Sequence, residues 1–554
     1  MNKIRYSLLV ALVFIYNLVI AQTVEQGKQF LYYERYKSAK DVFEKTLAAN
    51  PNNIEAVYLL GRTLIAQKDT AAAKALLQKM LTTNGSAPLL LVGMGEVELM
   101  EGKNNDAKQR FETAISLTKA KDVMVLNAIG FANVDAKAGD ANYAIEKLTL
   151  ATQTKNFNNQ DTWIIMGDAY RKLVDGGNAV LCYQKALAIN PKLAQAKYRI
   201  GLIYLSQNNK EYFIPAFEDA IKMDPNYAPA YYALYVYYFN RDIDKAKEYF
   251  DKYLAVSDPE PSNDYDRTSI LYASKRNDEA ITTAKSYISS LGAKADPRYY
   301  KLIAYAYDAK GDSVNAKNYL DQYFARQKPD DFLPKDYSFQ AELLSKFPGN
   351  DSLVYRDFQL AIDKDTALND KLDLMKEAID LAKKTGNKSA SARFAGEMYL
   401  TVKNPTNTDL YNWGYSNYQA GNYKTADSIF CGLYQSKYPN EIFGYLWCAR
   451  SKQAQDDSTN SQGLAVAAYE KLAQMARSLD SVKYKPQAVQ SYYYLASYYN
   501  DIKKDKQAAI GYLQKILEVD PANPEVPGII EKLKKPPPKP PPAKPKTGAK
   551  TGTK

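Results

Sequence analysis

The chain has 554 residues, of which 46% are hydrophobic and 24% charged, and it contains 47 tyrosines but no histidine. This composition is that of a folded protein. The absence of histidine excludes Ser–His–Asp and Cys–His nucleophiles, histidine general bases and every histidine-containing metal site. The net charge of +11 comes largely from the C-terminal residues 532–554, so the rest is nearly neutral and no nucleic-acid partner is expected.

Residues 1–21 predict a secretory signal peptide. Lys3 and Arg5 precede an apolar stretch from Leu8 to Ile20, and Ala21 stands before Gln22. The stretch is shorter than the roughly 20 residues of a transmembrane helix, although an uncleaved signal anchor is the alternative. No cysteine follows it, which excludes a lipoprotein anchor. We therefore expect an exported, periplasmic protein that has no transmembrane segment after signal removal. A more specific expectation is that it associates with the outer membrane.

A repeat of 34 residues follows. Gly27, Gly61 and Gly95 are each 34 residues apart, and Gly130 marks a fourth copy. The clearest copies lie between Asp161 and Pro225, and their marker positions are Trp163, Gly167, Ala179, Ala186, Pro191, Gly201, Ala220 and Pro225. Small residues suit positions where two helices cross closely, and proline cannot continue the helix that it follows.

This spacing resembles the tetratricopeptide repeat (TPR), a helix–turn–helix unit with a W-x2-L-G-x2-Y…A-x3-F…P pattern. The resemblance implies an all-α solenoid, a right-handed superhelix of about twelve to fourteen repeats. A seventh copy has Tyr235 where glycine is usual. Later copies are marked by Gly414, Ala426 and Ala508.

The expected organisation is a signal peptide at 1–21, an N-terminal array of about nine repeats at 22–328, degenerate helical repeats and an elbow at 329–406, C-terminal repeats with a capping helix at 407–534, and a disordered tail at 535–554. Proline-rich sequence favours an extended form. For the lysine- and proline-rich tail two interpretations stay open, a solubilising tail or a basic tether that contacts an anionic surface.

The three cysteines show no zinc-ligand spacing. Cys182 is expected as a partly buried thiol. Cys431 and Cys448 fall on helices that should be neighbours, so a disulfide in an oxidising compartment and two free thiols are both open. No catalytic, metal or cofactor site is expected, because neither a GxGxxG nor a GxxxxGK[ST] motif occurs.

In the TPR family, ligands contact positions 2, 5, 9 and 12 of the first helix of each repeat. Carrying these positions over gives the candidate partner-binding residues Lys28, Tyr58, Arg62, Glu96, Asp168, Arg171, Tyr198 and Tyr232. This mixture of side chains suits an extended peptide. It does not resemble the carboxylate clamp of co-chaperone TPR domains.

The signal-like start and the Lys/Tyr/Asn-rich composition resemble exported periplasmic TPR proteins of Bacteroidota. The resemblance implies a non-enzymatic scaffold, a subunit or adaptor of a secretion, motility or outer-membrane assembly, whose partners are other envelope proteins. The alternative is a cell-wall or glycan-binding adaptor that uses tyrosine faces and the basic tail.

Overall fold

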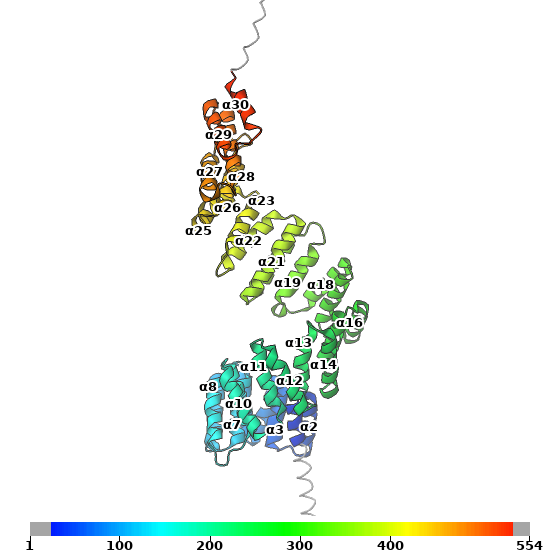
Figure 1. The fold of residues 1–554 in the computed structure, drawn as a ribbon. Helices are drawn as coiled ribbons and strands as arrows, with labels where there is room; N and C mark the ends of the chain where they lie inside the picture. Colours follow the sequence, from blue (N-terminus) through cyan, green and yellow to red (C-terminus); the bar gives the residue numbers. More distant parts are fainter. Residues whose placement is uncertain (1–23, 536–554) are drawn as a thin grey trace, which may run out of the picture. The chain divides into compact units, whose positions relative to one another are not determined.

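The structure, a computed structural model, describes residues 24–535 (Figure 1). The expected signal peptide and all but the first residue of the expected tail lie outside the described residues. Within 24–535 every regular element is helical, and no helix is long and apolar enough to cross a bilayer.

Consecutive described helices pair into thirteen hairpins. The hairpins are 24–32 with α2 (Tyr36–Ala49), α3 (Ile54–Ala66) with α4 (Thr70–Thr83), α5 (Pro88–Met100) with α6 (Asn104–Leu117), α7 (Val123–Asp135) with α8 (Ala141–Thr152), α9 (Gln160–Lys172) with α10 (Gly176–Ile189), α11 (Ala194–Ser206) with α12 (Lys210–Met223), α13 (Ala228–Phe239) with α14 (Ile243–Val256), α15 (Pro261–Ala273) with α16 (Asn277–Leu291), α19 (Pro334–Leu344) with α20 (Asp351–Lys364), α21 (Leu368–Thr385) with α22 (Lys388–Thr401), α23 (Asn407–Gln419) with α24 (Tyr423–Asp427), η3 (Ser428–Tyr434) and α25 (Gln435–Lys437), α26 (Ile442–Gln455) with α27 (Val466–Asp480), and α28 (Lys485–Ser497) and η4 (Tyr498–Ile502) with α29 (Lys506–Val519). Between α16 and α19 the chain forms α17 (Arg298–Ala309) and α18 (Ser313–Arg326). The capping helix is α30 (Val526–Lys534), which buries Val526 and Ile530.

The repeat glycines lie where the two helices of a hairpin touch. A Cβ atom at Gly95 would lie 2.5 Å from the Phe111 ring, and one at Gly201 would lie 2.6 Å from Phe217. The same contact recurs in the other hairpins with a marker glycine, as Gly27 with Phe43, Gly61 with Leu77, Gly130 with Leu148, Gly167 with Tyr183 and Gly414 with Phe430. Each second helix thus places a large side chain directly on the backbone of the first.

The other marker residues hold the positions that the repeat implies. Four alanines are completely buried, namely Ala179, Ala186, Ala220 and Ala426. Pro191 and Pro225 each follow the C-cap residue of a helix, α10 and α12 respectively. Trp163 is half-buried, with the Lys185 ammonium 4.2 Å from the centre of its ring.

Two positions depart from the repeat register. Ala509, and not Ala508, is completely buried in α29. The reason lies in the preceding helix, where the π-helical segment η4 adds one residue before the turn. In the seventh hairpin Tyr235 replaces glycine, and its buried ring packs against Phe250 with centroids 4.7 Å apart.

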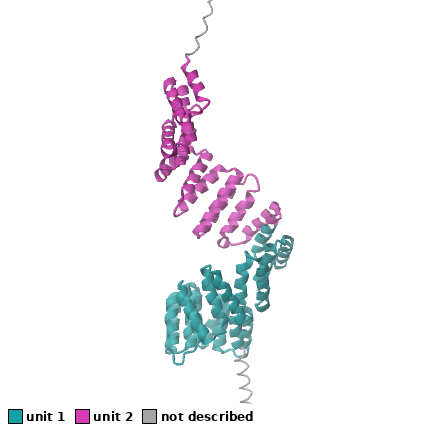
Figure 2. Cartoon of the chain, in the orientation of Figure 1, with its two compact units in different colours: residues 1–306 teal, residues 307–554 magenta. Residues whose placement is uncertain are grey.

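The chain divides into two compact units, residues 1–306 and 307–554, and the division falls within α17 (Figure 2). The segment 329–406, expected as an elbow, lies wholly within unit 2. Its helices α19 to α22 are 11 to 18 residues long and share a core that includes Phe358, Met375 and Phe394. Sequence degeneracy in this segment therefore coincides with continuous helical packing.

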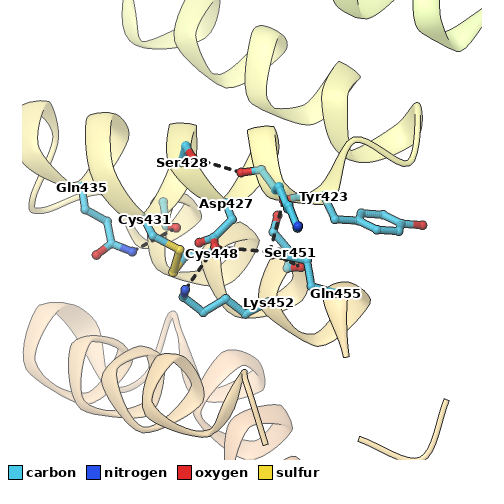
Figure 3. Close-up of a disulfide and its surroundings, with 11 residues drawn as sticks. Tyr423, Asp427, Ser428, Cys431, Gln435, Cys448, Ser451, Lys452 and Gln455 are labelled. Carbon is cyan, nitrogen blue, oxygen red and sulfur yellow. Dashed lines mark hydrogen bonds and ion pairs between the residues drawn. A yellow bond between two sulfur atoms is a disulfide. The ribbon is translucent and has the colours of Figure 1, made fainter. Parts of the chain in front are cut away.

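A disulfide joins two hairpins of unit 2 (Figure 3). Cys431 lies in η3 and Cys448 in the next first helix, α26, and their Cα atoms are 4.8 Å apart. Beside the bridge, Asp427 accepts hydrogen bonds from Lys452 at 3.1 Å and Gln455 at 3.2 Å. Cys182 is a buried free thiol.

We predict that Gly167→Ala lowers the free energy of unfolding by about 1–3 kcal/mol, because the added methyl group would overlap the buried ring of Tyr183. Gly177→Ala in the same hairpin is the control. A Cβ there meets only the Asp175 carboxylate, at 3.7 Å, and alanine is the better helix former by up to about 1 kcal/mol. Urea unfolding followed by circular dichroism measures both, and equal effects would contradict the glycine contact.

We predict that replacing Cys431 and Cys448 together by alanine lowers the stability of unit 2 by about 3 kcal/mol, because the bridge closes a loop over a sequence separation of 17. Cys182→Ala removes no cross-link and should leave the free energy nearer the native value. Denatured protein should titrate as one thiol before reduction and three after it. Three thiols before reduction would show that the bridge does not form.

Candidate functional site

The principal candidate site is a cavity of about 1020 Å³ in unit 1. It lies between the helix 24–32 and the first helices α3, α7, α9 and α11, and we call it the unit 1 cavity. Its polar wall includes Lys28, Tyr58, Arg62, Asp161, Asp168 and Arg199, and its apolar wall includes Leu31, Leu59, Phe131, Ile164 and Ile165. Polar groups set in an apolar concave wall are typical of a binding site.

The first hairpin closes the cavity by touching hairpins that lie far along the chain. Tyr32 packs against Tyr227 with ring centroids 5.2 Å apart, and its hydroxyl accepts a hydrogen bond from the Gln195 N–H at 3.3 Å. The Tyr33 hydroxyl donates to Asp224 at 3.0 Å. The first hairpin therefore closes one side of a cavity that stays open to solvent.

Asp258, which follows α14, also holds the first hairpin in place. It accepts hydrogen bonds from Arg35 Nε at 3.1 Å, from the Ser38 N–H at 2.9 Å and from the Ser38 hydroxyl at 2.5 Å. Burial alone would raise the pKa of Asp258, but these hydrogen bonds outweigh burial and lower the pKa. The carboxylate is thus held in its charged form.

Arg62 and Tyr58 each carry a buried polar atom without a hydrogen-bond partner of standard geometry. The Arg62 guanidinium lies 3.5 Å from the centre of the Phe131 ring, and its Nε is buried without a hydrogen-bond partner. The Tyr58 hydroxyl is also buried without a partner, although the side chain lines the cavity and is only 2% exposed. The two side chains interact with each other on α3, since the charge of Arg62 opposes the rise that burial causes in the pKa of Tyr58.

Glu96 lies close to Arg62 but makes no hydrogen bond through either side-chain oxygen. It is 1% exposed. Burial raises its pKa to about 8, while the charge of Arg62 opposes the rise. Glu96 is therefore mostly neutral at pH 7.

The Asp168 carboxylate in the cavity wall has both a hydrogen-bond donor and cationic neighbours. It accepts a hydrogen bond from the Tyr183 hydroxyl at 2.8 Å and lies 3.4 Å from Arg199 and 4.0 Å from Arg171. The Tyr183 ring is the one that rests on Gly167. The glycine contact thus also fixes the position of a cavity carboxylate.

Three further carboxylates lie in or beside the cavity without such partners. Glu34, Asp135 and Asp161 make no side-chain hydrogen bond or ion pair within residues 24–535. The surrounding walls raise the pKa of each by desolvation. Arg62 opposes the rise at Asp135 and Asp161, and Arg199 opposes it at Glu34.

The structure brings together part of the predicted partner-binding set. Lys28, Tyr58, Arg62 and Asp168 line the cavity, Glu96 lies behind Arg62, and Arg171 contacts Asp168. Tyr198 instead packs against Phe217 and Tyr227 with centroids 5.5 and 5.6 Å apart. Tyr232 belongs to a separate aromatic group with Tyr235 and Tyr253.

Several residues of the cavity are not among the partner-binding residues predicted from the sequence. Asp161, Asn127 and Phe131 occupy the same ligand-contact positions of their first helices, so applying the family pattern to every repeat would have found them. Tyr32 and Glu34 carry no such signal. They reach the site through the closure of the first hairpin, a contact between residues far apart in the sequence.

Unit 2 contains a smaller cavity of about 510 Å³ beside Trp447 and the loop that begins at Asp456. The loop carboxylates are occupied by its own backbone, since Asp457 accepts from the N–H groups of Thr459 and Ser461. The Trp447 ring is covered by Arg450 at 4.8 Å and by Phe430 at 6.2 Å. The nearby group of Asp427, Cys431 and Cys448 offers no thiolate, because the two sulfurs are bonded to each other.

Comparison with known proteins agrees with the helical architecture. Residues 30–91, 160–193 and 194–227 match family profiles described as tetratricopeptide repeat. The chain is thus a solenoid that contains TPRs, repeats that generally mediate contacts between proteins. A comparison with curated proteins finds no match.

Among solved structures, the chain is similar to the C-terminal part of a TPR repeat-containing protein from Cytophaga hutchinsonii, with 26% identity over 48% of this chain and 98% of that one and a TM-score of 0.28. It is similar to a tetratricopeptide repeat protein from Parabacteroides merdae, with 19% identity over 46% and 98% and a TM-score of 0.38. It is also similar to YrrB, described as a TPR protein with an unusual peptide-binding site, with 21% identity over 34% and 96% and a TM-score of 0.23.

We predict that Glu96→Gln flattens the pH dependence of stability between about pH 5 and 8. The folded-state pKa of Glu96, about 8, exceeds the unfolded value of about 4.3. The folded state therefore binds the extra proton, and the wild-type protein loses up to about 1.4 kcal/mol per pH unit as pH rises through this range. The variant should be the more stable protein at pH 9, as measured by urea unfolding.

Glu98→Gln on the same helix is the control. Glu98 is buried and accepts hydrogen bonds from Arg110 Nε at 2.8 and 2.9 Å, so its substitution should destabilise the protein at pH 9. A Glu96→Gln protein that is also less stable at pH 9 would show that Glu96 is charged and well paired.

Proposed function

We propose that this chain is a non-enzymatic protein-interaction scaffold of the cell envelope, whose unit 1 cavity holds an extended segment of a partner protein. The single observation that carries the proposal is the cavity, whose wall sets charged side chains such as Lys28, Arg62 and Asp161 beside an apolar face. Polar groups of a partner's backbone and side chains would pair with these charged groups. Apolar side chains would contact Leu59, Phe131 and Ile164.

Two features support an envelope location. Residues 1–21 have the sequence pattern of a secretory signal peptide. Cys431 and Cys448 pair as a disulfide, a bond that persists in oxidising compartments such as the periplasm. With the resemblance to exported TPR proteins of Bacteroidota, these features favour an adaptor or subunit of a secretion, motility or outer-membrane assembly.

The glycan-binding alternative has less support. Aromatic side chains bind sugars through free ring faces, and the rings beside the unit 2 cavity are already packed within the protein. Arg450 and Phe430 contact Trp447, and Tyr469 stacks on Tyr494 with centroids 4.1 Å apart. We therefore place the partner site in unit 1.

We predict that a photo-reactive amino acid at Met124, which lines the cavity and is 37% exposed, crosslinks a discrete envelope protein in living cells. The same amino acid at Leu181, on the second helix α10 and 55% exposed, is the matched control. Arg62→Ala should reduce the Met124 adduct at least fivefold, measured on immunoblots of periplasmic fractions. Equal adducts from both positions, or none from Met124, would contradict a partner in the cavity.

A further inference from the structure

Three side chains that are common metal ligands lie together in unit 2, where α24 and η3 meet α26 (Figure 3). A carboxylate oxygen of Asp427 and the sulfurs of Cys431 and Cys448 all lie within 4.8 Å of one another. Cys448 is buried, whereas Asp427 and Cys431 are half-buried. The group is therefore compact, and solvent can reach one side of it.

Helical spacing brings these side chains to facing surfaces. Asp427 and Cys431 are four residues apart, as are Cys448 and Lys452. Residues four apart share one face of a helix. The two faces meet so closely that the Cα atoms of the cysteines are 4.8 Å apart.

Side-chain packing holds the two faces together in addition to the bridge. Phe430 and Tyr434 of η3 are buried. The Phe430 ring lies against the backbone of Gly414 and 6.2 Å from the Trp447 ring of α26. The two sulfurs therefore remain neighbours when they are not bonded to each other.

The Asp427 carboxylate is already oriented by two outer neighbours. Lys452 Nζ at 3.1 Å and Gln455 Nε2 at 3.2 Å both donate to the same oxygen, Oδ2. Within residues 24–535 no hydrogen bond reaches the other oxygen, Oδ1. Outer partners that fix the orientation of a ligand are a regular feature of protein metal sites.

The bridged protein offers no thiolate, but every newly made chain carries these cysteines as thiols, and thiol–disulfide exchange can return them to that state. Two thiolates select a soft cation such as zinc over magnesium or calcium. Zinc accepts a carboxylate and a water molecule beside thiolates in a four-coordinate site. Two thiolates and one carboxylate around zinc leave one negative charge, which Lys452 offsets.

We propose that the dithiol form of this chain binds one zinc ion through Cys431, Cys448 and Asp427, with a water molecule as the fourth ligand. A dithiol reductant converts the bridge to two thiols and is itself oxidised to a disulfide. As the two zinc–sulfur bonds form, both thiol protons pass to solvent. Because zinc and the bridge use the same sulfurs, bound zinc protects the dithiol from oxidation. The proposal does not depend on a partner in the unit 1 cavity.

The test uses the full chain with Cys182→Ala, in which the bridge cysteines are the only cysteines. The protein is reduced with a phosphine, freed of reductant without air and titrated with cobalt(II) as a coloured substitute for zinc. We expect one cobalt ion per chain, with a thiolate-to-cobalt absorption band that zinc abolishes. The bridged protein should show no such band. A reduced protein without the band, or equal binding by the bridged protein, would overturn the proposal.

Asp427→Asn tests the third ligand. We expect this variant to bind zinc at least about tenfold more weakly, as measured by competition with a chromophoric chelator. Asp373→Asn, at an exposed position of α21, is the matched control and should bind as the parent protein does. Equal affinities of the two variants would overturn the proposed three-residue site.

Two measurements on the native sequence do not depend on the variants' stability. Native mass spectrometry of the reduced protein should show the added mass of one zinc ion less two protons, and the bridged protein should gain no zinc. Oxidised glutathione should re-form the bridge about tenfold more slowly when zinc is at about ten times its Kd, because only the metal-free dithiol reacts. A rate that zinc leaves unchanged would overturn the proposal.

Discussion

The contact between a glycine of one helix and a large side chain of the next determines the rest of the structure. Where Gly95 meets Phe111 and Gly201 meets Phe217, two helices approach until a ring rests on bare backbone. This distance sets the angle of each hairpin, and stacking of hairpins sets which side chains point inward. At Gly167 the ring belongs to Tyr183, whose hydroxyl then holds Asp168 in the cavity wall. Packing and site geometry are thus fixed by one contact.

The pKa values of acids in unit 1 depend on burial and on the neighbouring arginines. The repeats are nearly neutral, and the cavity wall carries both signs of charge, with Lys28, Arg62, Lys121 and Arg199 beside Asp122, Asp161 and Asp168. Arg62 illustrates the point, because its guanidinium stacks on Phe131 instead of forming an ion pair. The result is a concave surface on which groups of both charges stand beside apolar side chains.

Local spacing predicted the hairpins and much of the site, because each repeat is defined by neighbours in sequence. The 34-residue period located Gly27, Gly61 and Gly95, and family positions located Lys28, Tyr58 and Arg62. Features that depend on distant or irregular contacts were not predictable. The π-helical turn at Tyr498–Ile502 moved the buried alanine to Ala509, and no local pattern indicates that Glu34 would face a helix 160 residues away. The pairing of Cys431 with Cys448 stayed open because sequence gives neighbours but not redox state.

The contacts of Arg35 and Ser38 with Asp258 change how unit 1 melts. An open array of repeats behaves as a one-dimensional chain, whose ends fray and whose stability is a sum over neighbours. The first hairpin is bonded to the segment after α14 and is therefore not a free end. The hairpins between them cannot unfold one after another starting from the N-terminus. We therefore expect this part of the protein to unfold as one cooperative block, with hydrogen exchange as slow in the first hairpin as in the middle ones.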